Sequence, residues 1–304
     1  MPMATPAAVP SYRGRFAPSP SGPLHAGSLV AALGSYLDAR AHHGTWLVRI
    51  EDIDPPREIA GAADTILQQL ESHGLHWDEP VTWQSQNSPR YLQRLEQLQA
   101  AGLTYFCTCT RAEIKARGNH YDGFCRNLQR GANGAATRLL NLNPVQQFFD
   151  RWHGSVQLAP ALANEDFVLR RRDQLWAYQL AVVADDYASG ITDIVRGEDL
   201  LHASGWQLTL WQSFSQLDQG LSPPRLAHLP LILGEDGRKL SKQNHATPII
   251  AANAAENLHM ASNALGLKLP HPNEYDSLEK YLLIAVHAWQ GRYASAPEAG
   301  FAKE

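Results

Sequence analysis

The sequence predicts an α/β fold built around a mostly parallel sheet. Patterns typical of strands and of amphipathic helices alternate up to residue 102 and again after residue 176, at the spacing of strand–helix–strand units. Between them, residues 103–175 are richer in loops, glycine and asparagine, which indicates an inserted and more antiparallel module. A chain of 304 residues is long enough for about two domains.

Composition limits the class of protein. Hydrophobic residues make up 44% and charged residues 18%, as expected of a globular chain with a substantial core. No apolar run approaches the roughly 20 residues needed to cross a bilayer, so no membrane partner is expected. The net charge of −4 argues against nucleic acid coating the whole surface but leaves room for a local basic face. Residues 1–10 lack the basic start of a signal peptide, and we expect flexible tails at 1–10 and 295–304 and a cytoplasmic location.

A loop rich in proline, glycine and serine opens into the first helix. Residues 15–28 read RFAPSPSGPLHAGS, and the apolar spacing that follows predicts a helix ending near Gly44. The free N–H groups and positive end of a helix N-terminus favour phosphate. His25 adds a donor there, and Gly27 leaves space for a flat ring against the backbone. A lone His-x-Gly is weak evidence for a nucleotide site.

A strand and two helices follow in the first half of the chain. Thr45–Ile50 read as a strand that ends in an acidic cluster beginning at Glu51. Open α/β sheets bind ligands at the carboxyl ends of their strands, although a solvated acidic turn has the same composition. Apolar spacing predicts a helix over residues 59–73 and another over 88–101, with Ser88 as the N-cap of the second.

Three cysteines, the whole complement of the chain, lie in the inserted module. They are Cys107, Cys109 and Cys125. An odd number so close together suits a metal site in a reducing compartment better than disulfides, and reduced thiols without metal are the alternative. Zinc requires a fourth ligand in a closed tetrahedral site. The residues offer His120, Tyr121 or Asp122, of which general chemistry favours His120.

The remaining elements also follow from apolar patterns. A hairpin is predicted from residues 148–152 and 155–158, and we assign it to the inserted module. An apolar segment begins at Tyr178, a strand covers 191–195, and a helix begins near Ser204. A second strand is predicted at 229–233, and the chain beyond residue 243 reads as helical up to about residue 294.

A second basic signature follows the last predicted strand. Lys239 and Lys242 come after a Gly/Asp turn, which places them on a loop. Two ammonium groups three residues apart can neutralise the charge of a triphosphate during group transfer. Taken alone, such a pair is more typical of a solvated basic loop.

Together, the two signatures resemble those of the class I aminoacyl-tRNA synthetases. HAGS at residues 25–28 is similar to their nucleotide-binding motif, and KLSKQ at 239–243 to their mobile loop. The glutamyl branch is indicated by RFAPSPSG, RIED and IVRGED, which begin at residues 15, 49 and 194. The resemblance covers residues 13 to about 245. Ser28 replaces the usual second histidine but keeps a donor for phosphate, and Gln243 replaces a serine or arginine.

This resemblance implies a Rossmann-type catalytic domain in two halves, residues 11–102 and 176–240. The zinc-containing α+β module at 103–175 would be inserted between them, and a mobile loop with a short helical stem-contact region would cover 241–294. Since one branch of the family has a Cys, Cys, Tyr, Cys pattern, the resemblance implies Tyr121 as the fourth ligand of a structural Zn²⁺.

The resemblance also implies the roles of individual residues. The expected glutamate pocket is formed by Arg15, Ala17, Ser19, Glu51, Tyr178 and Arg196. The arginines would hold carboxylates and Glu51 the ammonium, and a buried arginine would reject the neutral amide of glutamine. The expected catalytic residues are His25, Gly27, Ser28, Lys239 and Lys242, acting with Mg²⁺. ATP would contact His25, Gly27 and Lys242 while the glutamate α-carboxylate attacks its α-phosphorus, giving glutamyl-adenylate and pyrophosphate.

The length of the C-terminal part distinguishes members of the branch. The chain has 304 residues, so 61 follow Gln243, fewer than a domain of about 100–150 residues requires. We therefore expect no anticodon-binding domain. We expect a monomer. The resemblance then implies that it uses L-glutamate, ATP and tRNA(Asp), and transfers glutamate to queuosine at the wobble position. The alternatives are an ordinary glutamyl-tRNA synthetase charging a 3′ end and a non-catalytic RNA-binding relative.

Overall fold

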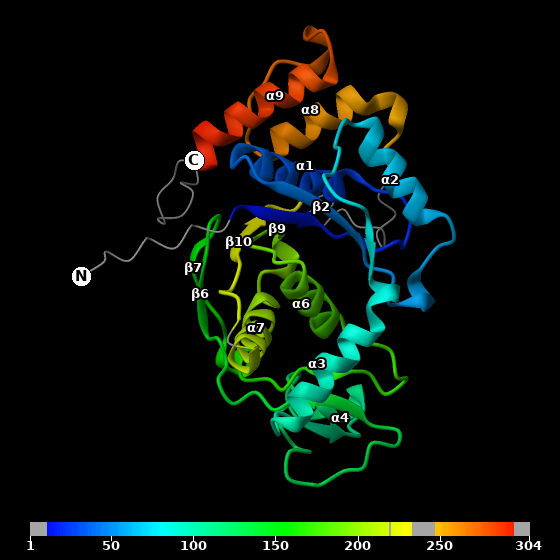
Figure 1. The fold of residues 1–304 in the computed structure, drawn as a ribbon, viewed down its shortest axis with the longest axis vertical. Helices are drawn as coiled ribbons and strands as arrows, with labels where there is room; N and C mark the ends of the chain where they lie inside the picture. The colour runs from blue at the N-terminus through cyan, green and yellow to red at the C-terminus, as the bar shows by residue number, and fades with distance from the viewer. Residues whose placement is uncertain (1–10, 219, 233–246, 295–304) are drawn as a thin grey trace, which may run out of the picture.

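The computed structural model describes residues 11–218, 220–232 and 247–294, and it confirms the α/β fold. Figure 1 shows the central strands between two sets of helices. Above them lie α1 (Ala26–Ala41), α8 (Ala254–Ala264) and α9 (Leu278–Trp289); below them lie α6 (Tyr178–Ala188) and α7 (Ser204–Asp218). None of the helices in these parts of the chain combines the length and apolar character that crossing a bilayer requires.

Two sets of parallel strands form the centre of the molecule. The first contains β1 (Arg13–Phe16), β2 (Thr45–Ile50) and β3 (Thr82–Trp83), in that order. In the second, β10 (Arg225–Leu229) lies between β9 (Asp193–Gly197) and β6 (Gln147–Asp150), parallel to both. Arg13 and Thr192 join the two sets, because the Arg13 N–H donates to Thr192 Oγ1 at 2.8 Å and the Thr192 N–H to the Arg13 carbonyl at 2.9 Å. This pairing brings β1 beside the start of β9.

Three sequence predictions about strands differ from the structure. No strand is predicted at β1, whose last two residues begin the predicted loop, and β10 ends at Leu229, where a strand is predicted to begin. The predicted hairpin exists as β6 (Gln147–Asp150) and β7 (Gly154–Gln157), but it extends the central sheet beside β10. It does not belong to the inserted module, because its apolar side chains, such as Phe148, pack in a cluster with residues of β9 and β10.

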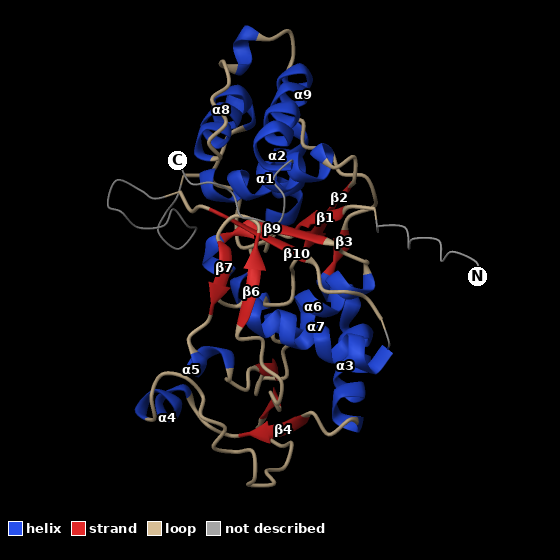
Figure 2. Ribbon diagram, turned by 90° about the vertical axis from the view of Figure 1, so that its left-hand side faces the viewer, coloured by secondary structure: helices blue, strands red, loops and turns tan. Residues whose placement is uncertain are grey.

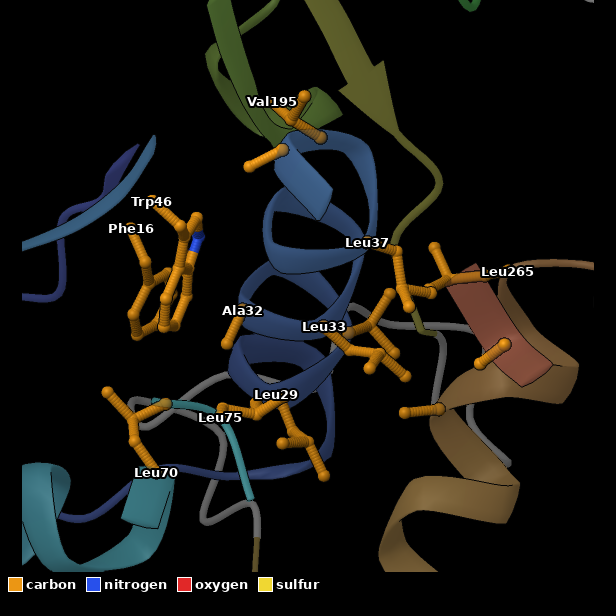
Figure 3. Packing of buried hydrophobic residues seen from close by; sticks show 14 of the residues in the cluster. Phe16, Leu29, Ala32, Leu33, Leu37, Trp46, Leu70, Leu75, Val195 and Leu265 are labelled. Atoms are coloured by element: carbon orange, nitrogen blue, oxygen red, sulfur yellow. The ribbon is translucent and has the colours of Figure 1, made fainter. Parts of the chain in front are cut away.

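Helix α1 is the centre of the largest apolar cluster. Figure 3 shows Trp46 and Phe16 on one side of it and Leu265, the residue that follows α8, on another, with Leu33 facing Leu265. Gly34 allows the close approach of β10, since a Cβ at this position would lie 2.4 Å from Leu229 Cδ1. The predicted helix therefore packs against both the sheet and the C-terminal helices.

A buried aspartate joins α9 to the rest of this core. Asp38 of α1 accepts hydrogen bonds from Tyr12 Oη at 2.6 Å and from Trp289 Nε1 at 3.0 Å, and it pairs with Arg151. Because Trp289 lies in α9, the C-terminal helices are part of the same packed body as the first strands. The helical region predicted after residue 243 is thus found, as far as the described residues extend.

The inserted module forms a separate three-stranded antiparallel sheet. Its strands are β4 (Thr104–Cys107), β5 (Ala136–Leu139) and β8 (Val168–Arg170), with α4 (Arg111–Ala116) beside them. Figures 1 and 2 show this module at the opposite end of the molecule from α8 and α9. The helices predicted before it are α2 (Ala62–Ser72) and α3 (Ser88–Ala100). Ser88 is the first residue of α3, and the N-cap position is occupied by Asn87.

Candidate active site

Four buried charged side chains form one ion network near the carboxyl ends of β1 and β2. Asp186 of α6 accepts from Arg15 Nε and Nη2, at 3.0 Å each, and from Arg49 Nη1 at 2.7 Å. Arg49 Nη2 donates to Glu51 Oε1 at 3.2 Å. The predicted residues Arg15 and Glu51 therefore lie in one network, joined by Arg49 and by Asp186, which the sequence analysis did not assign to the site.

Burial and charge act in opposite directions in this network. Burial, the largest influence, raises the pKa of Glu51 even though Arg49 and Arg15 oppose it. Burial also acts to raise the pKa of Asp186, but Arg15 and Arg49 hold that pKa below its ordinary value. The ionised form of Glu51 is thus less stabilised by its surroundings than the ionised form of Asp186. An ammonium group placed beside it would favour its ionised form.

Arg196 of β9 is held by uncharged partners. Its Nε donates to His228 Nε2 at 3.1 Å, and its Nη2 donates to Ser204 Oγ and Gln207 Oε1, both at 2.7 Å. Its Nη1 is buried and has no hydrogen-bond partner among the residues that the structure describes. Burial is the largest influence on Arg196 and lowers its pKa. This guanidinium therefore has the capacity to bind an anion.

His228 and Asp150 extend this arrangement. The Nε2 of His228 accepts from Arg196, so we assign its proton to Nδ1, which donates to Asp150 Oδ2 at 2.6 Å. Burial and the charge of Arg196 lower the pKa of His228 to about 4 despite Asp150, which keeps the ring neutral. Sequence reasoning missed both residues. The one sequence feature that could have indicated them is a polar residue within a buried strand, at His228, or at the end of one, at Asp150.

A cavity of about 180 Å³ opens beside the ion network. Three of the residues predicted to contact glutamate line it: Ser19, Glu51 and Tyr178. Burial, then Glu51, raises the pKa of Tyr178 to about 12, while Arg196 and Arg15 act against this shift. The two arginines are thus close enough to act on Tyr178, although neither lines the cavity. Ala17, which follows β1 directly, is half-buried and does not line it either.

A second cavity, also about 180 Å³, lies at the start of α1. His25, Gly27 and Ser28 line it together with Gly197 and Asp199, at the end of β9 and just beyond. His25 Nδ1 accepts from the Gly27 and Ser28 N–H groups at 3.1 and 3.4 Å, and Ser28 Oγ accepts from the His25 N–H at 2.8 Å. The first helical N–H groups, predicted to meet phosphate, therefore already have a partner in the His25 ring.

Lys239 and Lys242 lie outside the described residues. Two described residues that flank this segment lie near the start of α1. Ile232 lines the cavity of His25, and Pro248 forms a β-bridge with His25 itself. The roles predicted for the two lysines remain predictions.

The three cysteines of the inserted module converge. Their Sγ atoms lie within 4.8 Å of one another, and those of Cys109 and Cys125 are 3.5 Å apart. Four ligands about 2.3 Å from a zinc ion would be about 3.8 Å apart, so this spacing is compatible with the metal. Burial opposes ionisation of Cys125, but hydrogen bonds from the Thr108 backbone and Tyr121 outweigh it and lower its pKa to about 7.

The structure separates the candidates for a fourth ligand. Tyr121 is buried against Cys107 and Cys125, and its hydroxyl oxygen accepts from the Cys125 N–H at 2.8 Å. His120 Nδ1 pairs with Glu165 at 3.1 Å, and Asp122 pairs with Arg117 at 3.3 Å. The phenol is therefore the candidate whose oxygen lies next to a thiol.

Comparisons with known proteins agree with this organisation. The family model for the catalytic domain of class I tRNA synthetases (E and Q) matches residues 11–261. The chain is 55% identical over 278 residues to a glutamyl-Q tRNA(Asp) synthetase from Idiomarina loihiensis, covering 91% of this chain and 96% of that protein. A protein of the same name from Klebsiella pneumoniae is 53% identical over 279 residues, covering 92% of this chain and 94% of that one.

Solved structures show the same relationship at greater distance. A glutamate tRNA ligase from Elizabethkingia meningosepticum, in complex with its amino acid, aligns with a TM-score of 0.63 and 29% identity. The alignment covers 77% of this chain and 52% of that one, so the chain matches about half the length of that ligase. A glutamate-tRNA synthetase from Elizabethkingia anophelis aligns with a TM-score of 0.64 and 29% identity, covering 77% of this chain and 53% of that one. The chain belongs to the class I tRNA synthetases (E and Q).

Proposed function

We propose that the chain activates L-glutamate with ATP and transfers the glutamyl group to queuosine at the wobble position of tRNA(Asp). The observation that supports glutamate activation is the buried guanidinium of Arg196. Its Nη1 has no hydrogen-bond partner among the described residues, and the carboxylate of Glu51 is close enough to act on its pKa. Because the α-carboxylate must reach ATP, a cation at Arg196 and an anion at Glu51 would complement the remaining charged groups of glutamate, its side-chain carboxylate and its ammonium. The full-length similarity to proteins named glutamyl-Q tRNA(Asp) synthetase supports the second half.

In the activation step, the glutamate α-carboxylate attacks the α-phosphorus of ATP. A new carboxyl–phosphate bond forms, the bond to the β-phosphate breaks, and pyrophosphate leaves. ATP would bind in the cavity at the start of α1, which His25, Gly27 and Ser28 line. Mg²⁺ would enter with ATP and neutralise part of its charge. Alignment and charge, rather than a protein nucleophile, would lower the barrier.

In the transfer step, a hydroxyl of the queuosine cyclopentenediol attacks the activated carbonyl, and AMP leaves. We propose that Lys239 and Lys242 assist the phosphate chemistry and that the C-terminal helices contact the RNA stem. An ordinary glutamyl-tRNA synthetase is the second candidate, because solved enzymes of that kind share the catalytic part.

We also propose that Cys107, Cys109, Tyr121 and Cys125 hold a structural zinc ion. When bound, zinc would keep the thiols and the phenol ionised and tie β4 to the loop that follows α4. Arg138 lies over the Tyr121 ring, 3.7 Å from its centroid to the guanidinium carbon. Burial, the largest influence, raises the pKa of the Tyr121 phenol, so its ionisation would depend on the bound metal. The metal would thus order a loop-rich part of the module.

Transfer to defined RNAs tests the proposed function. Radiolabelled glutamate should become attached to tRNA(Asp) that carries queuosine, and not to tRNA(Asp) that carries guanine at the same position. Attachment to the 3′ end of tRNA(Glu) would instead support the ordinary synthetase. Absence of transfer to every tRNA, together with absence of amino-acid activation, would support the non-catalytic alternative.

Chelation tests the metal proposal. The purified protein should contain one zinc per chain, and its removal should lower the melting temperature and weaken transfer to RNA more than glutamate activation. Tyr121→Phe should lose zinc at a lower chelator concentration than the wild type. His120→Ala is the matched control, and an equal loss from this variant would contradict the assignment of Tyr121.

A further inference from the structure

Gln84 is a buried residue that the sequence analysis did not single out. It begins the 3₁₀ turn η2 (Gln84–Asn87), which follows β3, and its side chain is fully buried. Its Nε2 donates to Asp185 Oδ2 at 3.1 Å. An ionised carboxylate only accepts hydrogen bonds, so the amide nitrogen must face Asp185 and the amide oxygen must face away from it.

Asp185 fixes this orientation firmly. It also accepts from Asn87 Nδ2 at 3.0 Å, from Arg90 Nη1 at 2.6 Å and from Tyr91 Oη at 2.5 Å. An aspartate held by four donors from one segment of chain has little freedom to turn. The Gln84 amide is therefore anchored at its nitrogen, and its oxygen has a defined direction.

The oxygen of this amide has no partner in the parts of the chain that the structure describes. Gln84 Oε1 is buried and makes no hydrogen bond there. Gln84 lines the cavity that Ser19, Glu51 and Tyr178 also line. A buried acceptor without a donor is destabilising, so a residue kept in this state at the wall of a cavity is suited to meet a donor from a ligand.

We propose that Gln84 Oε1 accepts a hydrogen bond from the ammonium group of the amino-acid substrate, beside Glu51. The inference deepens the proposed function and rests on it. Among the groups of free glutamate, both carboxylates are acceptors at neutral pH, and only the ammonium has N–H donors. Glu51 supplies the charge and Gln84 a directed neutral acceptor, so together they select an α-amino acid over a simple dicarboxylate.

Two matched variants test this role. Gln84→Met and Asn87→Leu each remove one amide donor to Asp185, but Asn87 does not line the cavity. In glutamate-dependent ATP–pyrophosphate exchange, Gln84→Met should raise the KM for glutamate about 10- to 100-fold. Asn87→Leu should change the KM for glutamate less than about threefold, while the melting temperatures of the two variants should fall by similar amounts.

A ligand without the ammonium group isolates the contact. Glutarate should inhibit the wild type and Gln84→Met with equal inhibition constants, because the lost hydrogen bond has no counterpart in this ligand. An unchanged KM for glutamate in Gln84→Met, or an equal weakening of glutarate, would overturn the inference. If Gln84→Met does not fold, Gln84→Asn keeps the amide but shortens its reach, and it should show the same selective effect.

These outcomes are distinguishable from failure of the proposed function. A folded wild type without glutamate-dependent exchange overturns both proposals. Exchange by the wild type together with an unchanged Gln84→Met overturns only the role of Gln84.

Discussion

The two arginines predicted to face glutamate are held in opposite ways. Arg15 gives two nitrogens to Asp186, so a buried anion offsets its charge. Arg196 donates hydrogen bonds to a neutral imidazole, a hydroxyl and an amide. The carboxylate of Asp150 contacts the imidazole of His228 and not Arg196 itself. Two arginines identified by motifs of the same family can therefore have different functions. We propose that Arg15 stabilises the fold of the site and that Arg196 binds an anionic ligand.

His228 explains how a charged group is accommodated without a neutralising partner. A carboxylate in direct contact with Arg196 would compete with a substrate carboxylate for the same guanidinium. A neutral histidine orients the guanidinium and leaves most of its charge available. The position of Asp150 behind the ring fixes the tautomer that this geometry requires.

The largest effect is expected for the anion in the Arg15 network. Asp186→Asn leaves Arg15 and Arg49 with less buried negative charge and should lower the free energy of unfolding by about 3–5 kcal/mol. Urea denaturation measures this change. The exposed pair Arg13–Glu79 is the matched control, and Glu79→Gln should cost no more than about 1 kcal/mol. Equal effects of the two substitutions would contradict a structural role for Asp186.

The next effect concerns catalysis rather than stability. Arg196→Met removes the guanidinium that we propose for a glutamate carboxylate, and kcat/KM for glutamate in pyrophosphate exchange should fall about 100-fold. Its loss of stability should be smaller than that of Asp186→Asn, because no buried charge is left unpaired. If Arg196→Met has a normal kcat/KM for glutamate, the proposal that Arg196 binds substrate while Arg15 stabilises the fold is wrong.

The effect that is smallest near neutral pH is a pH dependence caused by His228. Its pKa in the folded chain, about 4, lies below the value of about 6.5 expected when unfolded. As pH falls from about 6.5 to about 4, the unfolded chain binds a proton that the folded chain does not, so stability decreases by at most about 1.4 kcal/mol per pH unit. Melting temperatures between pH 4 and 7 should show this slope, and His228→Gln should reduce it. If the wild type and His228→Gln show the same dependence of melting temperature on pH, a group other than His228 causes it.

Local patterns predicted the elements of the fold well. The apolar spacing of α1 and the alternating residues of β2 depend on neighbours in the chain, and both helix and strand are found where predicted. β1 was missed because four residues beside a Pro/Gly-rich loop have too weak a pattern. The hairpin of β6 and β7 was recognised, but its sheet depends on Leu226 pairing with Asp150, a contact between distant segments.

The site shows the same limit. The motifs identified Arg15, Glu51 and Arg196, and the structure brings all three into one buried region. Their partners were not predictable, because Asp186 meets Arg15 across 171 residues and Asp150 meets His228 across 78. Gln84 illustrates the point further: its proposed role depends on which of its two amide atoms is held by Asp185, a residue 101 positions away, and sequence contains no information on that.

The central claim is that an uncompensated buried guanidinium selects an acidic amino acid. ATP–pyrophosphate exchange without tRNA, compared for glutamate and glutamine, tests it most directly. The account predicts exchange with glutamate and at least about 100-fold lower kcat/KM with glutamine, because the neutral amide of glutamine would leave the charge of Arg196 without an anion. Comparable exchange with the two amino acids would contradict it.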